Sequence, residues 1–505
     1  MFAMLKDKIK FVFIGALLFS STPLFAAQDI QAITPKEQYL KTIDFIDKMA
    51  KDIYCYWDLK KEQHNVDWPT LINQAKARIN EQTSLEQFQE ILIQLAASIH
   101  DGHVNYRYPY KTKIFYTPIL VKKLDDGYYI SQVEQDKMTP YPVDLQSGDK
   151  VLGVNDQSIE EYISSKEQYI SASTNSARQS YASAALNSLE KFKTAPEGTL
   201  TVTVSKYDTH QIKTVDLPWI VFERKLPDIR PLSEVVKSKI LPGNIGVLNV
   251  TQMSHEEGVD ALIAAVKREM QALKNTNALI IDVRYNGGGA GEIGDSIISH
   301  FITQKVRRYQ AQLKNSTQAL YGRPNLVELF NQTDPAQYVY SEWLDYNIEP
   351  MKNDKPVYAK PVYILTNEFC FSACDTFVDS FSSNHIGEIL GAQTGGGTGY
   401  PLWFDLPWNL GSFRFSILRG YSNHERYLEG TGTIPDVKIT TTPRDLHHQL
   451  DGELIAAYDY VLKKLKGNQK NFSALKGKAL THYFSATQPE IVPFYIQEEY
   501  WQKLQ

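Results

Sequence analysis

Residues 278–289, ALIIDVRYNGGG, combine an uninterrupted apolar run with three consecutive glycines. Upstream, residues 254–274 have apolar side chains three and four apart, with Ser254 and Glu257 placed as a capping box, which predicts an amphipathic helix. Residues 244–250, NIGVLNV, predict a strand before that helix. A strand that is apolar throughout is typical of a parallel sheet covered on both faces, so this region predicts an α/β core.

The same alternation of strands and helices continues toward the C-terminus. Residues 361–366, PVYILT, predict another buried strand, and a helix is expected to begin near Ser372. We predict that the α/β core spans residues 229–445 and that residues 446–505 form a C-terminal helix and tail. Residues 303–356 interrupt the pattern with polar and aromatic sequence. We expect this insertion to act as a mobile lid or exosite, because long insertions are often functional.

The N-terminal half has a different character. Residues 28–105 show the apolar spacing of helices, whereas residues 106–228 are rich in strand-forming sequence. Residues 147–163, SGDKVLGVNDQSIEEYI, contain a Gly-Asp turn, a short apolar strand and an Asn-Asp turn, as at the end of a PDZ domain. The predicted fold class is α/β, in an α+β multidomain chain with an N-terminal helical domain and an inserted PDZ-like domain.

Composition and charge narrow the range of partners. The chain has 505 residues, 43% of them hydrophobic and 22% charged, which is typical of a globular protein with two or three domains. The formal net charge of −5 does not favour binding to nucleic acid or to an anionic membrane surface. We therefore expect no nucleic-acid partner.

The N-terminus has the pattern of a signal peptide. Three lysines precede the apolar run at residues 11–19, FVFIGALLF, and small residues follow it. This pattern predicts a signal peptide over residues 1–27, cleaved after Ala26 or Ala27. A buried helix or an uncleaved anchor is the alternative, but the run is short for a membrane span. We expect export to the periplasm or outside the cell, with no stable membrane span after cleavage.

The three cysteines are Cys55, Cys370 and Cys374. Export would place them in a compartment that permits disulfides, and an odd number leaves at least one free or paired with another molecule. Cys370 and Cys374 flank Ser372, and we expect them to form a local disulfide or to pack as small hydrophobic residues. No Cys/His spacing indicates zinc, and we predict neither a metal nor a cofactor.

Two segments of the core have features of a catalytic site. A serine at a strand-to-helix junction, such as Ser372, lies near free helix N–H groups that stabilise a developing oxyanion, although N-capping is the commoner role. The glycines at 287–289 allow backbone N–H groups to face a cavity. A tight turn or a phosphate loop would use similar glycines, but the P-loop lysine and the G-x-G-x-x-G pattern are absent.

Two further segments supply titratable side chains. His103, in SIHDGHVNY, begins an extended segment and is a candidate general base, whereas His100 is nearer the helix end and fits a structural role. Glu429, in YLEGTGTIPDVKI, precedes glycines at a turn that enters a strand. It is either a surface residue or part of the same site.

Four motifs in this order, ALIIDVRYNGGG, FSACD, GAQTGGGTG and EGTGTIPDV, resemble the C-terminal-processing (tail-specific) serine peptidases, which also have a PDZ-like segment upstream. The resemblance covers roughly residues 90–465. It implies a crotonase/ClpP-like α/β protease core. It also implies an exported serine endopeptidase that hydrolyses peptide bonds of proteins or peptides.

The family has two branches with different bases. One uses a Ser–Lys dyad, but here the Gly-rich segment GAQTGGGTGY lacks lysine, and Lys438 is the first lysine after Ser372. The other branch is similar to the tricorn core and the chlamydial protease-like activity factor, and it has D-x-H and E-x-x-G-x-x-P-D motifs. This chain matches the first motif at residues 101–103 and the second at residues 429–436. This resemblance implies Ser372 as nucleophile, His103 as general base and Glu429 as orienting acid.

The resemblance also implies an oxyanion hole formed by the backbone N–H groups of Ala373 and of Gly287 or Gly288. Tricorn-like sites have a serine just before the histidine, where this chain has Gly102. Glu429 would then have to reach His103 directly or through water.

Two residues beside the nucleophile also depart from the family pattern. Cys374 replaces a small residue and Asp375 replaces a glutamate. These changes leave a non-catalytic peptide- or hydrophobic-ligand-binding module on the same fold as one alternative. A crotonase-like acyl-thioester enzyme, which shares the Gly-rich oxyanion strategy, is the other. The retained Ser372, His103 and Glu429 favour the enzyme, and an exported chain has little access to coenzyme A.

A histidine base predicts a pH dependence. The imidazole must be neutral to accept the serine proton, so a pKa of about 6.5 predicts a rate that rises through mildly acidic pH. A carboxylate partner is expected to move that midpoint upward.

Overall fold

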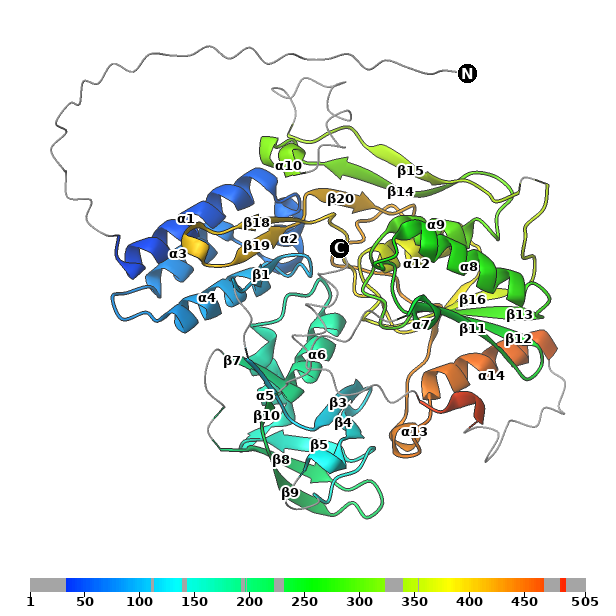
Figure 1. Cartoon of the computed structure of the whole chain (residues 1–505), viewed down its shortest axis with the longest axis horizontal. Helices are drawn as coiled ribbons and strands as arrows, with labels where there is room; N and C mark the ends of the chain where they lie inside the picture. Colours follow the sequence, from blue (N-terminus) through cyan, green and yellow to red (C-terminus); the bar gives the residue numbers. More distant parts are fainter. Residues whose placement is uncertain are drawn as a thin grey trace, which may run out of the picture.

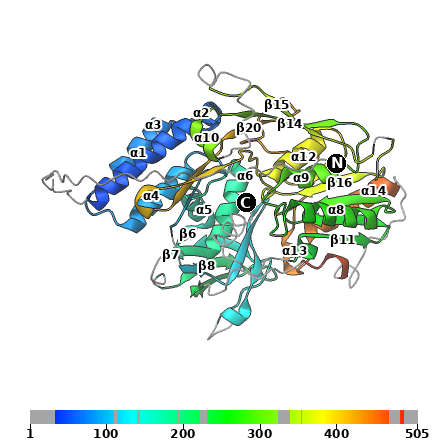
Figure 2. The same ribbon diagram turned by 45° about the horizontal axis from the view of Figure 1, so that its top comes forward.

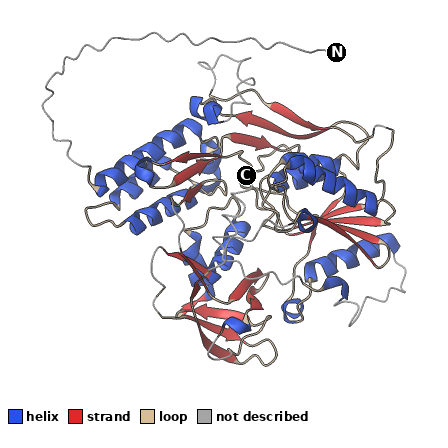
Figure 3. Ribbon diagram, viewed as in Figure 1, coloured by secondary structure: helices blue, strands red, loops and turns tan. Residues whose placement is uncertain are grey.

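The computed structural model of the chain has three units that meet near the middle of the molecule (Figure 1). Helices dominate the first unit, strands the second, and layers of both form the third (Figure 3). The predicted signal peptide lies outside the described residues. The structure describes residues 33–109, 113–138, 143–191, 196, 198–221, 231–322, 339–352, 354–466 and 482–486.

The first unit begins with four helices, which pack together in both views (Figures 1 and 2). Thr34 and Ser84 cap the first and fourth of them, because each side-chain oxygen accepts a backbone N–H three residues on. Their apolar faces bury a core that includes Ile43, Phe88 and Leu92. The helices are α1 (Pro35–Ile53), α2 (Trp57–His64), α3 (Trp68–Ala77) and α4 (Leu85–Ala97).

Two antiparallel sheets from later in the chain complete this unit, in the orders β1–β19–β18 and β15–β14–β20. Phe413 and Phe415 of one sheet, and Ala311 and Leu313 of the other, are buried in the same core as the helices. The elements are β1 (Asn105–Arg107), β14 (Val306–Leu313), α10 (Thr317–Gly322), β15 (Leu344–Ile348), β18 (Leu402–Asp405), η4 (Pro407–Asn409), β19 (Ser412–Phe415) and β20 (Leu418–Tyr421).

This packing differs from the predicted division of the chain. Residues 303–356 are not a detached insertion in their described part, because β14 is the central strand of a sheet that contains β20. Residues 402–421, expected in the α/β core, pack on the N-terminal helices instead. Sequence periodicity identifies a strand but not its partner, so it could not show which sheet these short strands join.

The second unit is a sheet of order β3–β4–β5–β8–β9, with β6 paired to β5, and a small sheet of order β10–β2–β7. Asn155 and Asp156, at the predicted Asn-Asp turn, both have positive φ (47° and 63°), as in a tight hairpin. The elements are β2 (Lys113–Tyr116), β3 (Ile119–Leu124), β4 (Gly127–Val133), η1 (Gln135–Lys137), β5 (Lys150–Val154), β6 (Gln157–Ser158), α5 (Ile159–Glu167), α6 (Asn175–Ala184), η2 (Ala185–Asn187), β7 (Ser188–Lys191), β8 (Leu200–Ser205), β9 (Ile212–Leu217) and β10 (Ile220–Val221).

The third unit is the α/β core, with a sheet of order β11–β12–β13–β16–β17–β21 that is parallel except for β11. Its elements are α7 (Leu232–Val235), β11 (Val236–Leu241), β12 (Ile245–Val250), α8 (Val259–Leu273), β13 (Ala278–Asp282), α9 (Gly291–Ile298), β16 (Val362–Thr366), α12 (Ala373–Ser383), β17 (Glu388–Gly391), β21 (Val437–Lys438), α13 (Pro443–His447) and α14 (Gly452–Lys466).

The apolar strand β13 is buried on both faces, as predicted. Leu279 and Ile281 pack in the core that contains α8, α9 and α12, while Ala278 and Ile280 pack against α14 on the opposite face. The expected C-terminal helix, α14, therefore covers the second face of the sheet in the α/β core. This sandwich holds the ends of β13 and β16 in fixed positions, and the site lies at these ends.

Helix α8 begins later than predicted. Its N-cap is Gly258 (φ 88°) rather than Ser254, whose Oγ instead accepts a hydrogen bond from Gln252 Nε2 at 2.9 Å. The backbone at Ser254 also lies against Gly289, which leaves no room for a side chain at that glycine. A contact with the glycine loop thus overrides the local capping signal.

Among the described helices, none is both long enough and apolar enough to cross a membrane.

Candidate active site

Ser372 lies in the turn between β16 and α12 and has a strained backbone. Its φ and ψ are 60° and −119°, whereas an ordinary N-cap is extended. Such a conformation costs a non-glycine residue about 1–3 kcal/mol and is concentrated at functional sites. The Ser372 N–H donates to Asp375 Oδ2 at 3.0 Å, which holds the turn. The sequence did not reveal this geometry, because the G-x-S-x-G pattern of other nucleophile turns is absent.

A disulfide joins Cys370 and Cys374 across this turn, with 5.4 Å between their Cα atoms. Both residues are fully buried. The bond therefore connects the segment before Ser372 to the first turn of α12. Cys55 is a buried free thiol in the first unit, and burial raises its pKa well above the ordinary value.

His103 comes from the first unit and reaches the serine across the boundary with the core. Its Nε2 lies 3.1 Å from Ser372 Oγ, within hydrogen-bond distance. Arg414 Nε donates to the His103 carbonyl at 2.8 Å, and the ring of Phe371 packs on the imidazole with 4.5 Å between centroids. The structure thus brings together the serine and histidine that the sequence had placed 269 residues apart.

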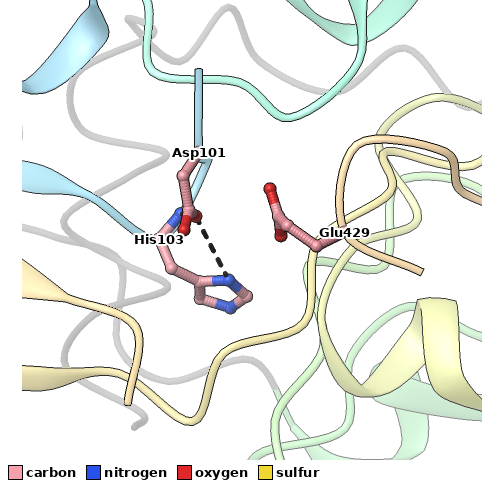
Figure 4. A group of neighbouring side chains, drawn as sticks. All are labelled: Asp101, His103 and Glu429. Carbon is pink, nitrogen blue, oxygen red and sulfur yellow. Dashed lines mark hydrogen bonds and ion pairs between the residues drawn. The ribbon is translucent and has the colours of Figure 1, made fainter. Parts of the chain in front are cut away.

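Two carboxylates, Asp101 and Glu429, face the other side of the imidazole (Figure 4). Asp101 Oδ1 lies 3.9 Å from His103 Nδ1 and accepts the His103 backbone N–H at 2.7 Å. Its Oδ2 accepts hydroxyl hydrogen bonds from Tyr54 and Ser416 at 3.0 and 2.9 Å. His103 Nδ1 is buried and has no hydrogen-bond partner within the described part of the chain.

Glu429 is fully buried, and other groups occupy its two oxygens. Oε1 accepts from Lys60 Nζ at 2.6 Å, and Oε2 accepts from the Thr398 N–H at 3.2 Å. Direct hydrogen bonding of Glu429 to His103, which the sequence left open, is therefore not observed. Each of Asp101, His103 and Glu429 nevertheless has one possible metal-ligand atom within 4.8 Å of those of the other two. The Lys60 ammonium already pairs with one of the two carboxylates, that of Glu429, which disfavours a metal ion there.

Lys60 is a site residue that the sequence did not indicate. It lies on α2 with its side chain fully buried, and Nζ also donates to the His100 carbonyl at 2.7 Å. Lys60 makes no contact with Ser372, so it does not take the place of a dyad lysine. In the helix sequence WDLKKEQH nothing distinguishes Lys60 from Lys61, since its partner Glu429 arrives from the far end of the chain.

The structure gives a physical reason for glycine, rather than serine, at position 102. A Cβ at this position would lie 2.6 Å from the ring of Phe371, which also fills the space beside Gly397. The Gly102 N–H donates to Ser173 Oγ at 3.0 Å, and the Ser173 hydroxyl hydrogen-bonds Glu429. A serine from the second unit thus interacts with Glu429.

Asp375 connects the turn at Ser372 to the glycine-rich segment. Its carboxylate accepts backbone N–H groups from Gly396 and Gly397 at 3.0 and 2.9 Å, in addition to that of Ser372. Burial raises the pKa of Asp375 to about 7 even though these hydrogen bonds lower it. The sequence had identified this residue only as a departure from the family pattern.

The expected oxyanion donors are not equivalent. The Gly288 N–H already donates to Asn286 Oδ1 at 2.9 Å, so Gly288 is not an available donor in this conformation. The N–H groups of Gly287 and Ala373 have no acceptor among the described residues. Gly288 instead permits close approach, because its φ is 96° and a Cβ there would lie 2.8 Å from that of Ser372.

The pKa of His103 shifts in the opposite direction from the one that the sequence predicted. Burial, with the charges of Arg414 and Lys60, lowers the pKa of His103 well below the ordinary value, rather than raising it. Burial and the charge of Asp101 raise the pKa of Glu429, and Lys60 opposes this shift. His100 stacks on His64 with 4.3 Å between centroids, and burial lowers its pKa to about 3, in keeping with a structural role.

Comparison with known proteins supports the same architecture. Residues 244–439 match the model of peptidase family S41, and residues 113–230 match that of the PDZ domain. The structure of mature CPAF complexed with lactacystin is 16% identical, with a TM-score of 0.70, over 86% of this chain and 99% of that one. Mature CPAF alone gives 16% and 0.69 with the same coverage. The photosystem II D1 C-terminal processing protease is 14% identical over 83% and 95%, with a TM-score of 0.40.

Proposed function

Because this chain belongs to peptidase family S41 and is a serine endopeptidase with a PDZ domain, we propose that Ser372 is its nucleophile and His103 its general base. The observation that carries the proposal is the 3.1 Å contact between Ser372 Oγ and His103 Nε2. The strained turn at Ser372 supports it, since nothing in ordinary N-capping requires a positive φ. The substrates are proteins or peptides.

The proposed reaction is acyl transfer. Ser372 Oγ attacks the carbonyl carbon of the scissile bond while its proton passes to His103 Nε2. The tetrahedral intermediate then expels the amine, which receives that proton from His103. Water attacks the acyl-enzyme by the same route in reverse and releases the second product. Every proton is returned, so no cofactor is required.

The carbonyl oxygen becomes negative during attack and needs donors. We assign this role to the N–H groups of Gly287 and Ala373, which flank the nucleophile and have no other acceptor among the described residues. The Ala373 N–H also belongs to the first turn of α12, where the helix dipole favours negative charge.

Asp101 and Glu429 together would orient His103 and stabilise the imidazolium. Their positions on one side of the ring favour the tautomer with the proton on Nδ1, which leaves Nε2 free to accept from Ser372 (Figure 4). The 3.9 Å separation from Asp101 exceeds a hydrogen bond. Such contacts are often long without substrate and tighten when it binds.

A fluorophosphonate probe tests the nucleophile directly. The wild-type protein is expected to be labelled at Ser372, and Ser372→Ala and His103→Ala are expected to lose the label. Ser383→Ala, at the opposite end of α12, is the matched control and should label like the wild type. Intact-mass and peptide-mapping mass spectrometry locate the adduct. A wild-type protein that stays unlabelled while binding peptides would point to a non-catalytic module.

We also propose that the protein is exported and works in the periplasm or outside the cell. The signal-peptide pattern at residues 1–27 supports export, and the Cys370–Cys374 disulfide supports an oxidising compartment. N-terminal sequencing of protein from the periplasmic or culture fraction is expected to begin at Ala27 or Gln28. Full-length protein confined to the cytoplasm would contradict this proposal.

A further inference from the structure

Three aromatic side chains from separate parts of the chain meet beside the proposed site. The rings of Tyr285 and Phe369 stack at 5.2 Å between centroids, and Tyr181 meets Phe369 edge-on at 5.0 Å. Tyr285 follows β13, Phe369 belongs to the nucleophile turn, and Tyr181 lies on α6 of the PDZ domain. We call these three residues the aromatic shelf.

Hydrogen bonds attach the shelf to the catalytic segments. The Tyr285 N–H donates to Asn367 Oδ1 at 3.0 Å, and the Phe371 N–H donates to the Asn286 carbonyl at 3.0 Å. These bonds join the segment that leads to Gly287 with the segment that leads to Ser372. On the PDZ side, Ser180 Oγ donates to Glu368 Oε1 at 2.6 Å. The rings therefore have a defined position relative to the nucleophile.

Tyr285 combines strain with exposure. Its φ is 62°, a conformation that is unusual for a bulky side chain and costs about 1–3 kcal/mol. It is also 46% exposed, although most large aromatic residues on a folded chain are covered. Tyr285 differs from other strained and exposed aromatic residues in its place, because its ring stacks on Phe369, three residues before Ser372.

Charged groups of two units surround Tyr285. The charged groups of Lys122, Glu453 and Arg284 act on its phenol. Lys122 belongs to the PDZ unit and pairs with Glu453 of α14 at 2.8 Å. The exposed ring thus lies between the PDZ domain and the protease core.

We propose that the aromatic shelf is a specificity-determining subsite that receives an apolar side chain of the peptide substrate. This inference rests on the proposed function. Phe369 precedes Ser372 by three residues, a span of about 10 Å at most. An extended substrate advances about 3.3 Å per residue, so the bound side chain lies within about three residues of the scissile bond. An apolar side chain that covers an aromatic face removes apolar surface from water, and this favours binding.

Cleavage profiling of a peptide library tests the shelf. The wild-type enzyme is expected to prefer apolar side chains at one position within three residues of the cut. Tyr285→Asn removes the ring but suits the left-handed backbone. It is expected to lower kcat/KM about 10-fold or more for peptides with an apolar residue there, mainly through KM, and to change little for serine-containing counterparts. Tyr285→Phe is expected to keep the preference.

Trp408→Asn is the matched control. Trp408 is also an aromatic residue with positive φ (57°) and is 42% exposed, but it lies in the turn between β18 and β19. This variant is expected to cleave the library like the wild type. Fluorophosphonate labelling of Ser372 is measured in every variant, and Tyr285→Asn is expected to retain it.

The outcomes separate the two proposals. A wild type without an apolar preference, or an unchanged profile in Tyr285→Asn, would overturn the subsite. Loss of labelling in both Tyr285→Asn and Tyr285→Phe would assign Tyr285 a structural role instead. A wild type that does not label at Ser372 would overturn the proposed catalytic machinery, and the subsite with it.

Discussion

His103→Ala is expected to lower kcat about as much as Ser372→Ala, by roughly 10⁶-fold, and the double variant is expected to be no worse than either. Without His103 no described side chain contacts Ser372 Oγ to accept its proton. Because serine and base act as one unit, removing either leaves only the catalysis supplied by oxyanion donors and substrate binding. Steady-state kinetics on one peptide substrate measure the effect.

Lysine variants supply the control for this experiment. Lys438 pairs with Asp125 at 2.8 Å on the surface, with 66% of its side chain exposed, so Lys438→Ala is expected to keep full activity. An inactive Lys438→Ala beside an active His103→Ala would refute the histidine base and remove the role of Glu429 with it.

The pH profile adds a check on the same base. Since the pKa of His103 is lowered, its imidazole stays neutral to lower pH than a free histidine. The rate is therefore expected to hold through mildly acidic pH and to fall with a midpoint below about 6.5, as His103 becomes protonated. A midpoint of kcat/KM above that value would show that the carboxylates outweigh burial, Arg414 and Lys60.

Lys60→Met is expected to destabilise the protein by about 3–5 kcal/mol, because it leaves Glu429 buried beside Asp101 without a countercharge. The matched change at an exposed ion pair, Lys438→Met, is expected to cost under about 1 kcal/mol. Urea denaturation followed by circular dichroism measures both free energies of unfolding.

A double-mutant cycle separates charge from packing. Glu429→Gln alone leaves the Lys60 ammonium buried with the His100 carbonyl and is also expected to destabilise. The variant that combines Lys60→Met with Glu429→Gln is expected to be more stable than the sum of the two changes predicts, since no unpaired charge remains. Strict additivity would show that the two side chains are not coupled.

The activity of the Glu429→Gln variant also tests whether Glu429 orients His103. Glu429→Gln is expected to lower kcat by up to about 10⁴-fold if Glu429 acts as a triad carboxylate does. A much smaller loss, with Asp101→Asn severely impaired, would assign that role to the carboxylate that lies 3.9 Å from His103 Nδ1.

Local sequence was sufficient for the elements of the core, and the resemblance to a family indicated Ser372 and His103. The strand at β13, the turn at Ser372 and the segment at His103 each follow from short-range patterns, because backbone geometry and side-chain periodicity act over a few residues. The ordered motifs then pointed to a family and a chemistry. A cysteine pair four residues apart was likewise enough to raise the disulfide that the structure contains.

Long-range packing determined the remaining features. The pairing of β14 with β20 joins residues that are more than a hundred positions apart. The burial of Lys60 rather than Lys61 likewise depends on Glu429, which is more than a hundred positions away. Gly102 is a departure from a motif in the sequence, but in the fold it makes room for Phe371. The pKa of His103 likewise follows from burial and from two cations on distant elements. Such contacts join segments that are far apart in the sequence and pack into the same core, so no short stretch of sequence is enough to predict them.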